Sequence, residues 1–592
     1  GLAALSLPFV RRRLRGASGA VGLAAGGLVF VIAGDWVHER VLSNIAFFAP
    51  VSLAATAGIA FGAALLGGFA GRGTARAPRA AALAAALLAL AALGSIALRQ
   101  RTEAAGGSAR DAAPTATAPE TVGNEQRPHV VLLVLDTLRA DRLGCYGYGR
   151  PTSPELDALA ARGVVFDHAV AAAPMTRGSI ASLFTSLDPD AHGTNDVLER
   201  LPDSADTLAE RFRRAGYATA CFSTNENVSP VFGFDQGFDT FWLHRLSRLE
   251  RFTAWGRLGH WVTETLGLGR QSADLDDSDA RHLTDAVLGW LPGAAKRSQF
   301  LYVHYIDPHS PYAPPEDLIN ADPPDPAWPA ERGRFPHNCP PHPFGEWPEQ
   351  EPGVLEAIAQ LYDAEIRFCD REVGRLVREL ERRGFLRDSF LVITADHGEE
   401  FFDHAQMGHG HSLYEELLRV PLLVLGPGIE PGRVAAPVQL IDLLPTLVTL
   451  CGGVPEPADD STHETRGRDL APLLLAPAEE RAALAAEVAA PFVFSARVID
   501  PPQAMVRVGT EKLIVIEHAG ETCVRLFDLA ADPHEQHDLA AVRPERVTAL
   551  RELLERRRAA ARATRLEGVA DVELSDDSRA VLKALGYVAA DE

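Results

Sequence analysis

Four side chains that lie far apart in the sequence could together bind a metal ion and activate a nucleophile. Asp136 and the pair Asp396-His397 each follow a short apolar run, and Thr176 begins an apolar helical stretch after a turn. Carboxylates and an imidazole at the ends of buried strands, with a hydroxyl at a helix start, are typical of a metal-activated nucleophile. Each residue alone has a structural alternative, because Asp and Thr are common helix caps. The set predicts an enzyme.

Short apolar runs alternate with amphipathic helical patterns through the middle of the chain. This alternation predicts an α/β fold with a mostly parallel sheet and helices on both faces. In such sheets ligands collect beyond the carboxyl ends of the strands, which is where Asp136 and Asp396 stand. The expected strands cover residues 130–135, 218–223, 300–305, 390–395 and 421–425, and the expected helices cover 154–162, 207–215 and 354–383.

Composition divides the chain into four parts. The sequence predicts a membrane region at residues 1–102 and an Ala/Gly/Thr/Pro-rich linker at 103–127. It predicts the catalytic domain at 128–480 and a C-terminal subdomain at 481–592. The last part changes from alternating strands and helices to short strands joined by turns, which predicts a smaller antiparallel α+β unit. Its strand patterns lie at 504–508, 512–517 and 524–528, and its Arg/Glu-rich helix at 544–563.

Three apolar runs, at 17–34, 46–70 and 78–98, each approach the roughly 20 residues that a helix needs to cross a bilayer. Buried core helices are the alternative interpretation. Arginines cluster before the first run and between the second and third, and the positive-inside rule places both clusters in the cytoplasm. Three crossings would put the catalytic domain outside, on the periplasmic or outer face. The apolar Gly1–Val10 suggests the end of a further span upstream.

Charge and cysteine content narrow the function classes. The net charge of −22 falls almost wholly on the part after the membrane region, which argues against nucleic-acid binding. The six cysteines are scattered without metal-binding spacing. In an extracytoplasmic domain they permit disulfides, whose pairing the sequence leaves open.

Several motifs follow one another in order after residue 128. They are Val130-Val-Leu-Leu-Val-Leu-Asp-Thr-Leu-Arg-Ala-Asp141, Gly144-Cys-Tyr-Gly147, Gly233-Phe-Asp-Gln-Gly-Phe-Asp239, His304-Tyr-Ile-Asp-Pro-His309, Ala395-Asp-His-Gly-Glu399 and Leu585-Gly-Tyr587. This ordered set resembles the sulfatase family of the alkaline-phosphatase superfamily. The resemblance implies the alkaline-phosphatase-like fold from about residue 128 to the end of the chain.

The resemblance also implies a metal site. Asp136, Asp396 and His397 would be metal ligands, and the Thr176 oxygen would bridge metal and substrate. Oxygen donors with one imidazole suit Mn²⁺, Mg²⁺, Ca²⁺ or Zn²⁺. The metal would lower the pKa of the Thr176 hydroxyl and neutralise charge on the transferring group.

Further residues would complete the site. By the same resemblance His309 contacts the substrate oxyanion, and His409 and His411 occupy the region where sulfatases place a substrate-binding Lys or His. These histidines would stabilise negative charge, or one would protonate the leaving oxygen. Arg177 would pair with a phosphate oxygen. Alternatively, Asp307, His309 and His411 would hold a second metal ion.

Thr176 departs from the family pattern. A sulfatase nucleophile is a Cys or Ser in Cys/Ser-x-Pro-x-Arg that is converted to formylglycine, whereas here Gly178 and Ile180 replace Pro and Arg. Threonine cannot be oxidised to an aldehyde, so formylglycine is not expected. A threonine ester must be released by attack of water or an acceptor on the central atom, which suits phosphoryl groups better than sulfate. In this respect the chain resembles the phosphoethanolamine and phosphoglycerol transferases and nucleotide phosphodiesterases of the superfamily.

The sequence therefore predicts a membrane-anchored hydrolase or phosphotransferase that acts on phosphate or sulfate esters, with phosphoryl chemistry favoured. Its location suggests lipid head-group or glycan esters as substrates, besides small molecules. A sulfuric ester hydrolase without formylglycine and a non-catalytic binding protein with the same fold are the alternatives. His304 and His404 are expected to be structural.

Overall fold

The computed structural model describes parts of a compact unit that spans Thr121–Glu592. The described residues are 127–244, 279–291, 297–310, 312, 314–315, 317–318, 352–452, 465–488, 493–497, 501–518, 520–575, 578–579 and 582. The predicted membrane region and nearly all of the predicted linker lie outside them. Among the described residues, no helix is both long enough and apolar enough to cross a bilayer.

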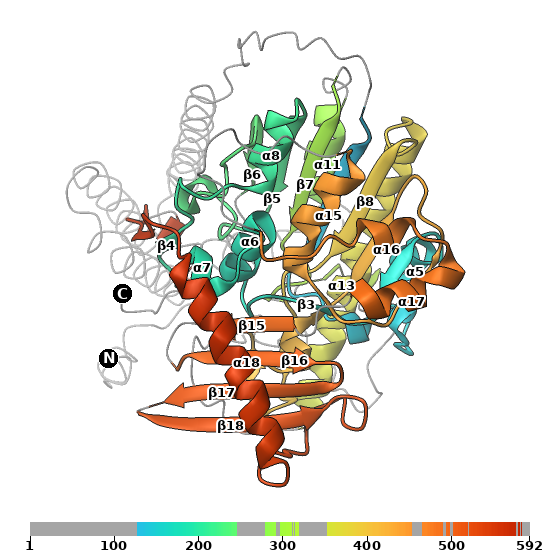
Figure 1. Cartoon of the computed structure of the whole chain (residues 1–592). Helices are drawn as coiled ribbons and strands as arrows, with labels where there is room; N and C mark the ends of the chain where they lie inside the picture. The colour runs from blue at the N-terminus through green and yellow to red at the C-terminus, as the bar shows by residue number, and fades with distance from the viewer. Residues whose placement is uncertain are drawn as a thin grey trace, which may run out of the picture. The chain divides into compact units, whose positions relative to one another are not determined.

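An eight-stranded sheet forms the centre of the unit, in the order β13-β2-β12-β8-β1-β7-β5-β6 (Figure 1). β1 pairs in parallel with both β7 and β8, and β5 continues the parallel arrangement between β7 and β6. The strands are β1 (His129–Leu135), β2 (Val164–Phe166), β5 (Ala218–Ser223), β6 (Thr240–Leu243), β7 (Gln299–Tyr305), β8 (Ser389–Thr394), β12 (Leu422–Leu425) and β13 (Gly432–Val434).

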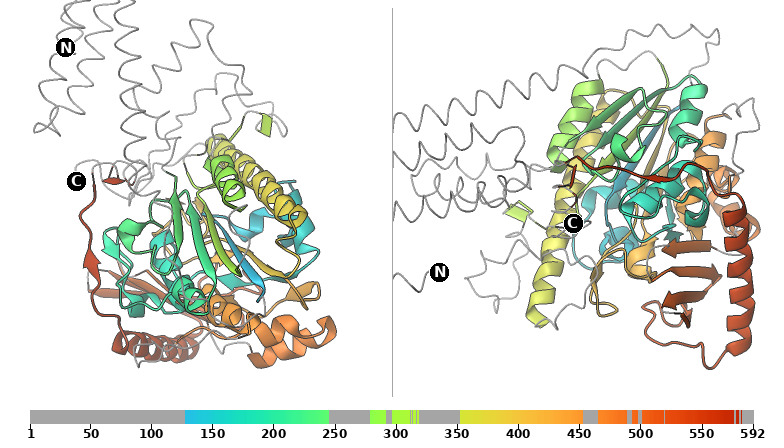
Figure 2. Two further views of the ribbon diagram at one scale, coloured as in Figure 1. Left: turned by 90° about the horizontal axis from the view of Figure 1, so that it is seen from above. Right: turned by 90° about the vertical axis from the view of Figure 1, so that its left-hand side faces the viewer.

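The central strand β1 is apolar without alternation, and its residues 130–135 are all buried. A strand with this pattern needs cover on both faces. Helices provide it, with α5, α11 and α13 packing together on one face and α6, α8 and α15 on the other (Figure 2). Their bounds are α5 (Pro154–Ala160), α6 (Thr176–Thr185), α8 (Leu208–Arg214), α11 (Asp279–Trp290), α13 (Pro352–Arg382) and α15 (Leu443–Leu450).

The predicted strands and helices of this region agree with the structure to within a few residues, and the sheet is mostly parallel as expected, with one predicted strand antiparallel. The strand predicted at 421–425 is β12, which runs antiparallel to both β8 and β2. A parallel return to the sheet needs a crossover, usually a long helix. Between β8 and β12 the chain forms only the four-residue helix α14 (Glu415–Leu418) and the short strands β9 (Glu400–Phe401), β10 (Met407–Gly408) and β11 (Arg419–Val420). It therefore returns antiparallel.

A second sheet lies beyond the first and is antiparallel throughout. It consists of β15 (Val493–Arg497), β16 (Gln503–Val508), β17 (Glu511–His518) and β18 (Glu521–Asp528), and α18 (Pro544–Ala563) crosses it (Figure 1). The buried ammonium of Lys512, on β17, lies 2.9 Å from a carboxylate oxygen of Glu415 and 2.9 Å from one of Glu535. Because Glu415 begins α14, this ion cluster ties the second sheet to the first.

Candidate metal centre

The carboxyl edge of the central sheet brings three of the predicted metal ligands together. Asp136 follows β1 directly, and Asp396 and His397 follow the neighbouring strand β8 after one residue. All three are fully buried. Among the described residues they form the one group of three acidic, histidine or cysteine side chains whose ligand atoms all lie within 4.8 Å of one another.

Each of the three side chains has one polar atom that the protein holds. Asp396 Oδ1 accepts backbone N–H groups from Thr137 at 3.1 Å and from His397 at 2.9 Å. His397 Nδ1 donates to the Gly398 carbonyl at 2.9 Å. Asp136 Oδ2 accepts from the Asn225 side-chain amide.

The opposite atoms of the same side chains face one another. His397 Nε2 lies 3.4 Å from Asp396 Oδ2 and 3.9 Å from Asp136 Oδ1. Within the described part of the chain, both of these carboxylate oxygens are buried and neither has a well-formed hydrogen bond, although the Thr176 hydroxyl interacts with the Asp396 carboxyl. Buried oxygens without a partner are costly, and a divalent cation bound by two carboxylates and a neutral imidazole would satisfy them. The residues present therefore fit a divalent metal ion.

The charges in this group are unbalanced without a cation. Burial raises the pKa of Asp136 well above its usual value, and the neighbouring Asp396 raises it further. Burial acts in the same direction on Asp396, but His397 and His304 outweigh it and lower the pKa of that carboxyl. Two buried carboxylates beside each other resist joint ionisation, and a bound cation would remove this resistance.

Thr176 joins the group from the other side. It is the first residue of α6, it is fully buried, and its Oγ1 lies 3.3 Å from His397 Nε2. The N-terminus of a helix carries a partial positive charge that favours an anionic oxygen. The nucleophile predicted from the sequence is therefore placed beside the ligand atoms that the protein leaves open.

The buried residue His192 contacts α6 through a hydrogen bond. His192, at the end of α7 (Pro189–His192), accepts the Thr194 N–H on Nδ1 at 3.0 Å, so its Nε2 carries the proton. Nε2 lies 3.0 Å from Ser182 Oγ on α6. Burial lowers the pKa of His192 to about 3, although a hydrogen bond to the Gly178 backbone acts in the opposite direction.

We expect this histidine to make the fold acid-sensitive. Because His192 takes up a proton near pH 6.5 when unfolded but only near pH 3 when folded, stability should fall as the pH drops through that window. The contribution is about 1.4 kcal/mol per pH unit. Urea unfolding at pH 7.5 and pH 5 should show a smaller acid loss for His192→Gln than for the wild type. An equal loss in both proteins would contradict this assignment.

Three more histidines were predicted to act at the site, and two of them lie close to it. The His409 ring centroid is 4.5 Å from that of His397 and 4.9 Å from that of His309. His409 Nδ1 lies 2.8 Å from Glu399 Oε1. Burial, with the neighbouring His397, lowers the pKa of His409 well below its usual value, and burial beside His409 lowers that of His309 to about 4. Both rings are therefore neutral at physiological pH.

His411 has a different hydrogen-bond partner from these two, although its charge acts on the pKa of His409. Its Nε2 is 2.7 Å from Glu400 Oε2. Among the described residues, Asp307, His309 and His411 are not grouped closely enough to appear as a second set of three ligand atoms, and the two-metal alternative stays a prediction. His404 was expected to be structural, and it stacks on Tyr414 with ring centroids 3.6 Å apart.

Arg177 is buried and has protein partners. Its guanidinium donates to the Asp196 carbonyl and to Asn227 Oδ1, each at 2.7 Å, and lies over the Phe232 ring at 3.5 Å. The predicted pairing with a substrate oxygen remains a prediction. A substrate would have to share this guanidinium with Asp196 and Asn227.

Two residues in contact with the candidate metal ligands were not identified as such from the sequence. Asn225 holds Asp136 Oδ2, and His304 Nε2 lies 3.3 Å from the same oxygen. His304 was expected to be structural, and its Nδ1 is also tied to Tyr302 OH at 2.8 Å. A usable signal existed for Asn225, since it follows β5, whose carboxyl end meets the same edge of the sheet.

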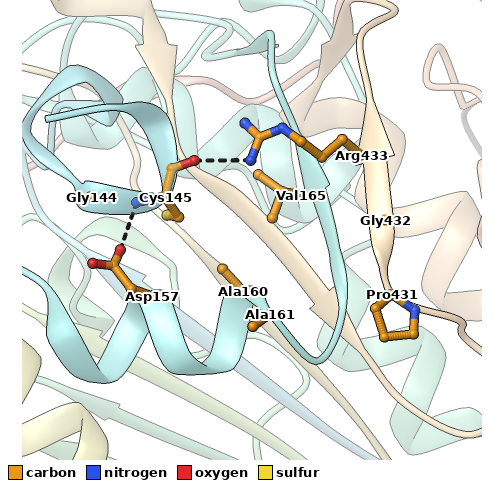
Figure 3. Close-up of a pocket in the computed structure, with 9 residues that line it drawn as sticks. All are labelled: Gly144, Cys145, Asp157, Ala160, Ala161, Val165, Pro431, Gly432 and Arg433. Atoms are coloured by element: carbon orange, nitrogen blue, oxygen red, sulfur yellow. Dashed lines mark hydrogen bonds between the residues drawn. The ribbon is translucent and has the colours of Figure 1, made fainter.

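A separate surface pocket contains none of the predicted site residues. It lies between α5 and β13, where Asp157 accepts the Cys145 N–H and Arg433 donates to the Cys145 carbonyl (Figure 3). Burial, with the adjacent Asp157, raises the pKa of the Cys145 thiol to about 12. A thiol that stays protonated at neutral pH is a poor nucleophile. The candidate chemistry therefore belongs to the sheet edge.

Comparison with known proteins agrees with this fold. A model of the sulfatase family matches residues 128–454, more than half of the chain. The uncharacterized sulfatase YidJ of Escherichia coli is 28% identical over 357 residues, which cover 55% of this chain and 68% of YidJ. A choline-sulfatase of Rhizobium meliloti is 25% identical over 441 residues, which cover 70% of this chain and 82% of that enzyme.

A solved structure shares the architecture. The phosphonate monoester hydrolase of Agrobacterium radiobacter superposes with a TM-score of 0.57 at 23% identity, covering 74% of this chain and 96% of that one. The family match and the shared architecture define a hydrolase of the alkaline-phosphatase superfamily. Within that superfamily, the chain belongs to the sulfatase family.

Proposed function

We propose that this chain is a divalent-metal-dependent hydrolase or transferase of phosphate or sulfate esters that uses Thr176 as its nucleophile, with phosphoryl esters preferred. The observation that carries the proposal is the position of the Thr176 hydroxyl. It lies 3.3 Å from His397 Nε2 and interacts with the Asp396 carboxyl, one of the two carboxyls in the group.

Asp136 Oδ1, Asp396 Oδ2 and His397 Nε2 would hold the metal, since the opposite atoms of these side chains are already engaged. When bound, the metal supplies a positive charge that lowers the pKa of a nearby hydroxyl and stabilises a transferring anionic group. Mn²⁺, Mg²⁺, Ca²⁺ and Zn²⁺ all accept this set of donors.

The reaction proceeds in two displacements. The Thr176 oxygen bonds to the phosphorus while the bond to the leaving oxygen breaks, and the hydroxyl proton ends on the leaving group. Water then attacks the phosphothreonine, giving phosphate and restoring the hydroxyl. An acceptor alcohol in place of water would make the same step a transfer.

His409 is suited to move the proton in both steps. The hydrogen bond to Glu399 places a proton on Nδ1, and the lowered pKa leaves Nε2 with its lone pair. Nε2 can therefore take a proton from the attacking oxygen and pass it to the leaving one. This supports a base role for His409 over a permanently charged donor. His309, neutral as well, lies against His409 and stays the candidate contact for the substrate oxygens.

The choice between phosphorus and sulfur rests on Thr176 itself. A threonine ester releases a phosphoryl group through attack at phosphorus, whereas formylglycine chemistry is closed to it. The related fold serves both elements, because similar proteins include a phosphonate monoester hydrolase and a choline-sulfatase. The sulfatase names of the relatives favour the second candidate, a sulfuric ester hydrolase that works without formylglycine.

We also retain membrane anchoring as part of the proposal, and with it lipid head-group or glycan esters as substrates.

Parallel assays of the full chain test the element preference. We expect an aryl phosphate or phosphonate ester to turn over at least about tenfold faster than an aryl sulfate when Mn²⁺ or Zn²⁺ is present, and chelation to abolish both activities. Acid quenching should trap a phosphorylated Thr176 peptide, detectable by mass spectrometry. Activity on the sulfate alone would overturn the phosphoryl preference. No activity together with no bound metal would favour the binding protein.

A further inference from the structure

A polar loop that follows β5 is almost completely buried. Residues 223–229 read Ser-Thr-Asn-Glu-Asn-Val-Ser, and none of them is more than 2% exposed. Buried polar groups cost free energy unless they are hydrogen-bonded, so specific partners must hold such a segment in place. We name Ser223–Ser229 the buried loop.

The buried loop contacts both the metal ligands and the nucleophile helix. Asn225 donates to Asp136 Oδ2, which turns the opposite oxygen of that carboxylate toward His397. Asn227 Oδ1 accepts from Arg177, the neighbour of Thr176, at 2.7 Å. The Asn227 N–H donates to Asn225 Oδ1 at 2.8 Å, so the two asparagines are fixed relative to each other.

A C-terminal segment reaches the same loop from the outside. After α18 the chain runs across the part of the unit that carries α7 (Figure 2). The Leu566 N–H donates to the Ala191 carbonyl at 2.8 Å. Further on, β19 (Ala570–Asp571) pairs with β4 (Glu199–Arg200). We name residues 565–575 together with Ser578 the tail.

The tail ends on the middle residue of the buried loop. Ser578 Oγ donates to Glu226 Oε1 at 2.8 Å, and both side chains are buried. The Ser578 N–H is itself held by Ser575 Oγ at 3.1 Å. Glu226 stands between Asn225 and Asn227, so this one hydrogen bond acts on the segment that carries both site contacts.

We propose that Ser578 and Glu226 are positioning residues for the metal centre. Their hydrogen bond holds the buried loop, which in turn fixes the orientation of Asp136 through Asn225. A hydrogen bond to a buried carboxylate is among the stronger ones in proteins, and partners that orient metal ligands influence metal affinity. This inference rests on the proposed metal site and adds the C-terminal tail to the residues that maintain it.

Metal affinity of the full chain, measured by equilibrium dialysis with Mn²⁺ and with Zn²⁺, tests the proposal. We expect Ser578→Ala and Glu226→Ala each to weaken binding by about tenfold, at the lower end of the effect of removing partners that orient ligands. The double variant should lose less than the sum of the two single losses, because Glu226→Ala already removes the interaction that Ser578→Ala removes. Glu226→Gln keeps an oxygen that accepts the Ser578 proton and should bind like the wild type.

A matched control is available at another contact of the tail. Ser204 Oγ donates to the Glu567 carbonyl at 2.9 Å, and Ser204 lies outside the buried loop. Ser204→Ala should leave metal affinity unchanged. Wild-type affinity in Ser578→Ala, or an equal loss in Ser204→Ala, would overturn the proposal.

If Ser578→Ala does not fold, the metal affinities of Glu226→Gln and Glu226→Ala are compared instead. Equal affinities of these two variants would overturn the proposal.

The results that contradict this inference can be told apart from those that contradict the proposed function. A wild-type chain that binds neither Mn²⁺ nor Zn²⁺ contradicts both. If the wild-type chain binds metal and its activity requires Thr176, but Ser578→Ala binds metal as tightly as the wild type, this inference alone is contradicted.

Discussion

Thr176→Ala should lower kcat/KM for the best ester substrate by about 10³-fold or more while metal binding is retained. Removal of a nucleophile leaves only the rate that binding and electrostatic stabilisation supply, which accounts for an effect of this size. Metal binding should persist because Asp136, Asp396 and His397 provide the ligand atoms. Steady-state kinetics and metal analysis of the same purified samples measure the two effects together.

Thr176→Ser is the matched control for this variant. It keeps a hydroxyl at the first position of α6 and removes one methyl group from a fully buried site. We expect it to retain measurable turnover and the covalent intermediate, now on serine. Full activity in Thr176→Ala would show that another group attacks the substrate, and it would remove the basis of the proposed function.

Asp396→Asn should weaken metal binding by at least about 100-fold, because it replaces a ligand rather than a residue that orients one. The variant keeps an oxygen for the Thr137 and His397 N–H groups, so local structure should survive. The apo chain should be no less stable than the wild type, since one of two adjacent buried carboxylates loses its charge. The stabilisation by metal, about 2.7 kcal/mol at a concentration 100 times Kd, should disappear.

Thermal unfolding with and without Mn²⁺ measures this difference. Asp442→Asn serves as the control. Asp442 is equally buried, but it lies outside the metal group and accepts hydrogen bonds from the Gln439 N–H and from Arg468. That variant should be destabilised in both conditions and still respond to metal. An Asp396→Asn chain stabilised by Mn²⁺ as strongly as the wild type would exclude Asp396 as a ligand.

Much of the fold could be predicted because the apolar pattern of most segments agrees with the helix or strand that they form. Unbroken apolar runs predicted β1, β5, β7 and β8, and a capping box at Thr207 and Glu210 marks the start of α8 where the helix was expected. The direction of β12 could not be predicted, because it depends on whether a crossover helix follows β8. The boundary at residues 480 and 481 stays a prediction.

The site was predicted where chemistry and position coincide in one residue. Asp136, Asp396 and His397 end strands, and their carboxylates and imidazole are metal ligands by type. Asn225 could have been found from its position after β5, but the sequence does not show which oxygen of Asp136 it would occupy. The contact between Ser578 and Glu226 joins residues 352 positions apart, and no local pattern reveals it.

The Lys512 ammonium also has a consequence for cooperativity. It is sealed from water between Glu415, which belongs to the catalytic part, and Glu535, which follows β18. Pulling the second sheet away would separate Lys512 from Glu415, while Glu535 would stay beside Lys512. Breaking a buried pair of this kind costs far more than breaking an exposed one. The two layers should therefore melt in a single transition, and the second sheet should not survive as an excised fragment.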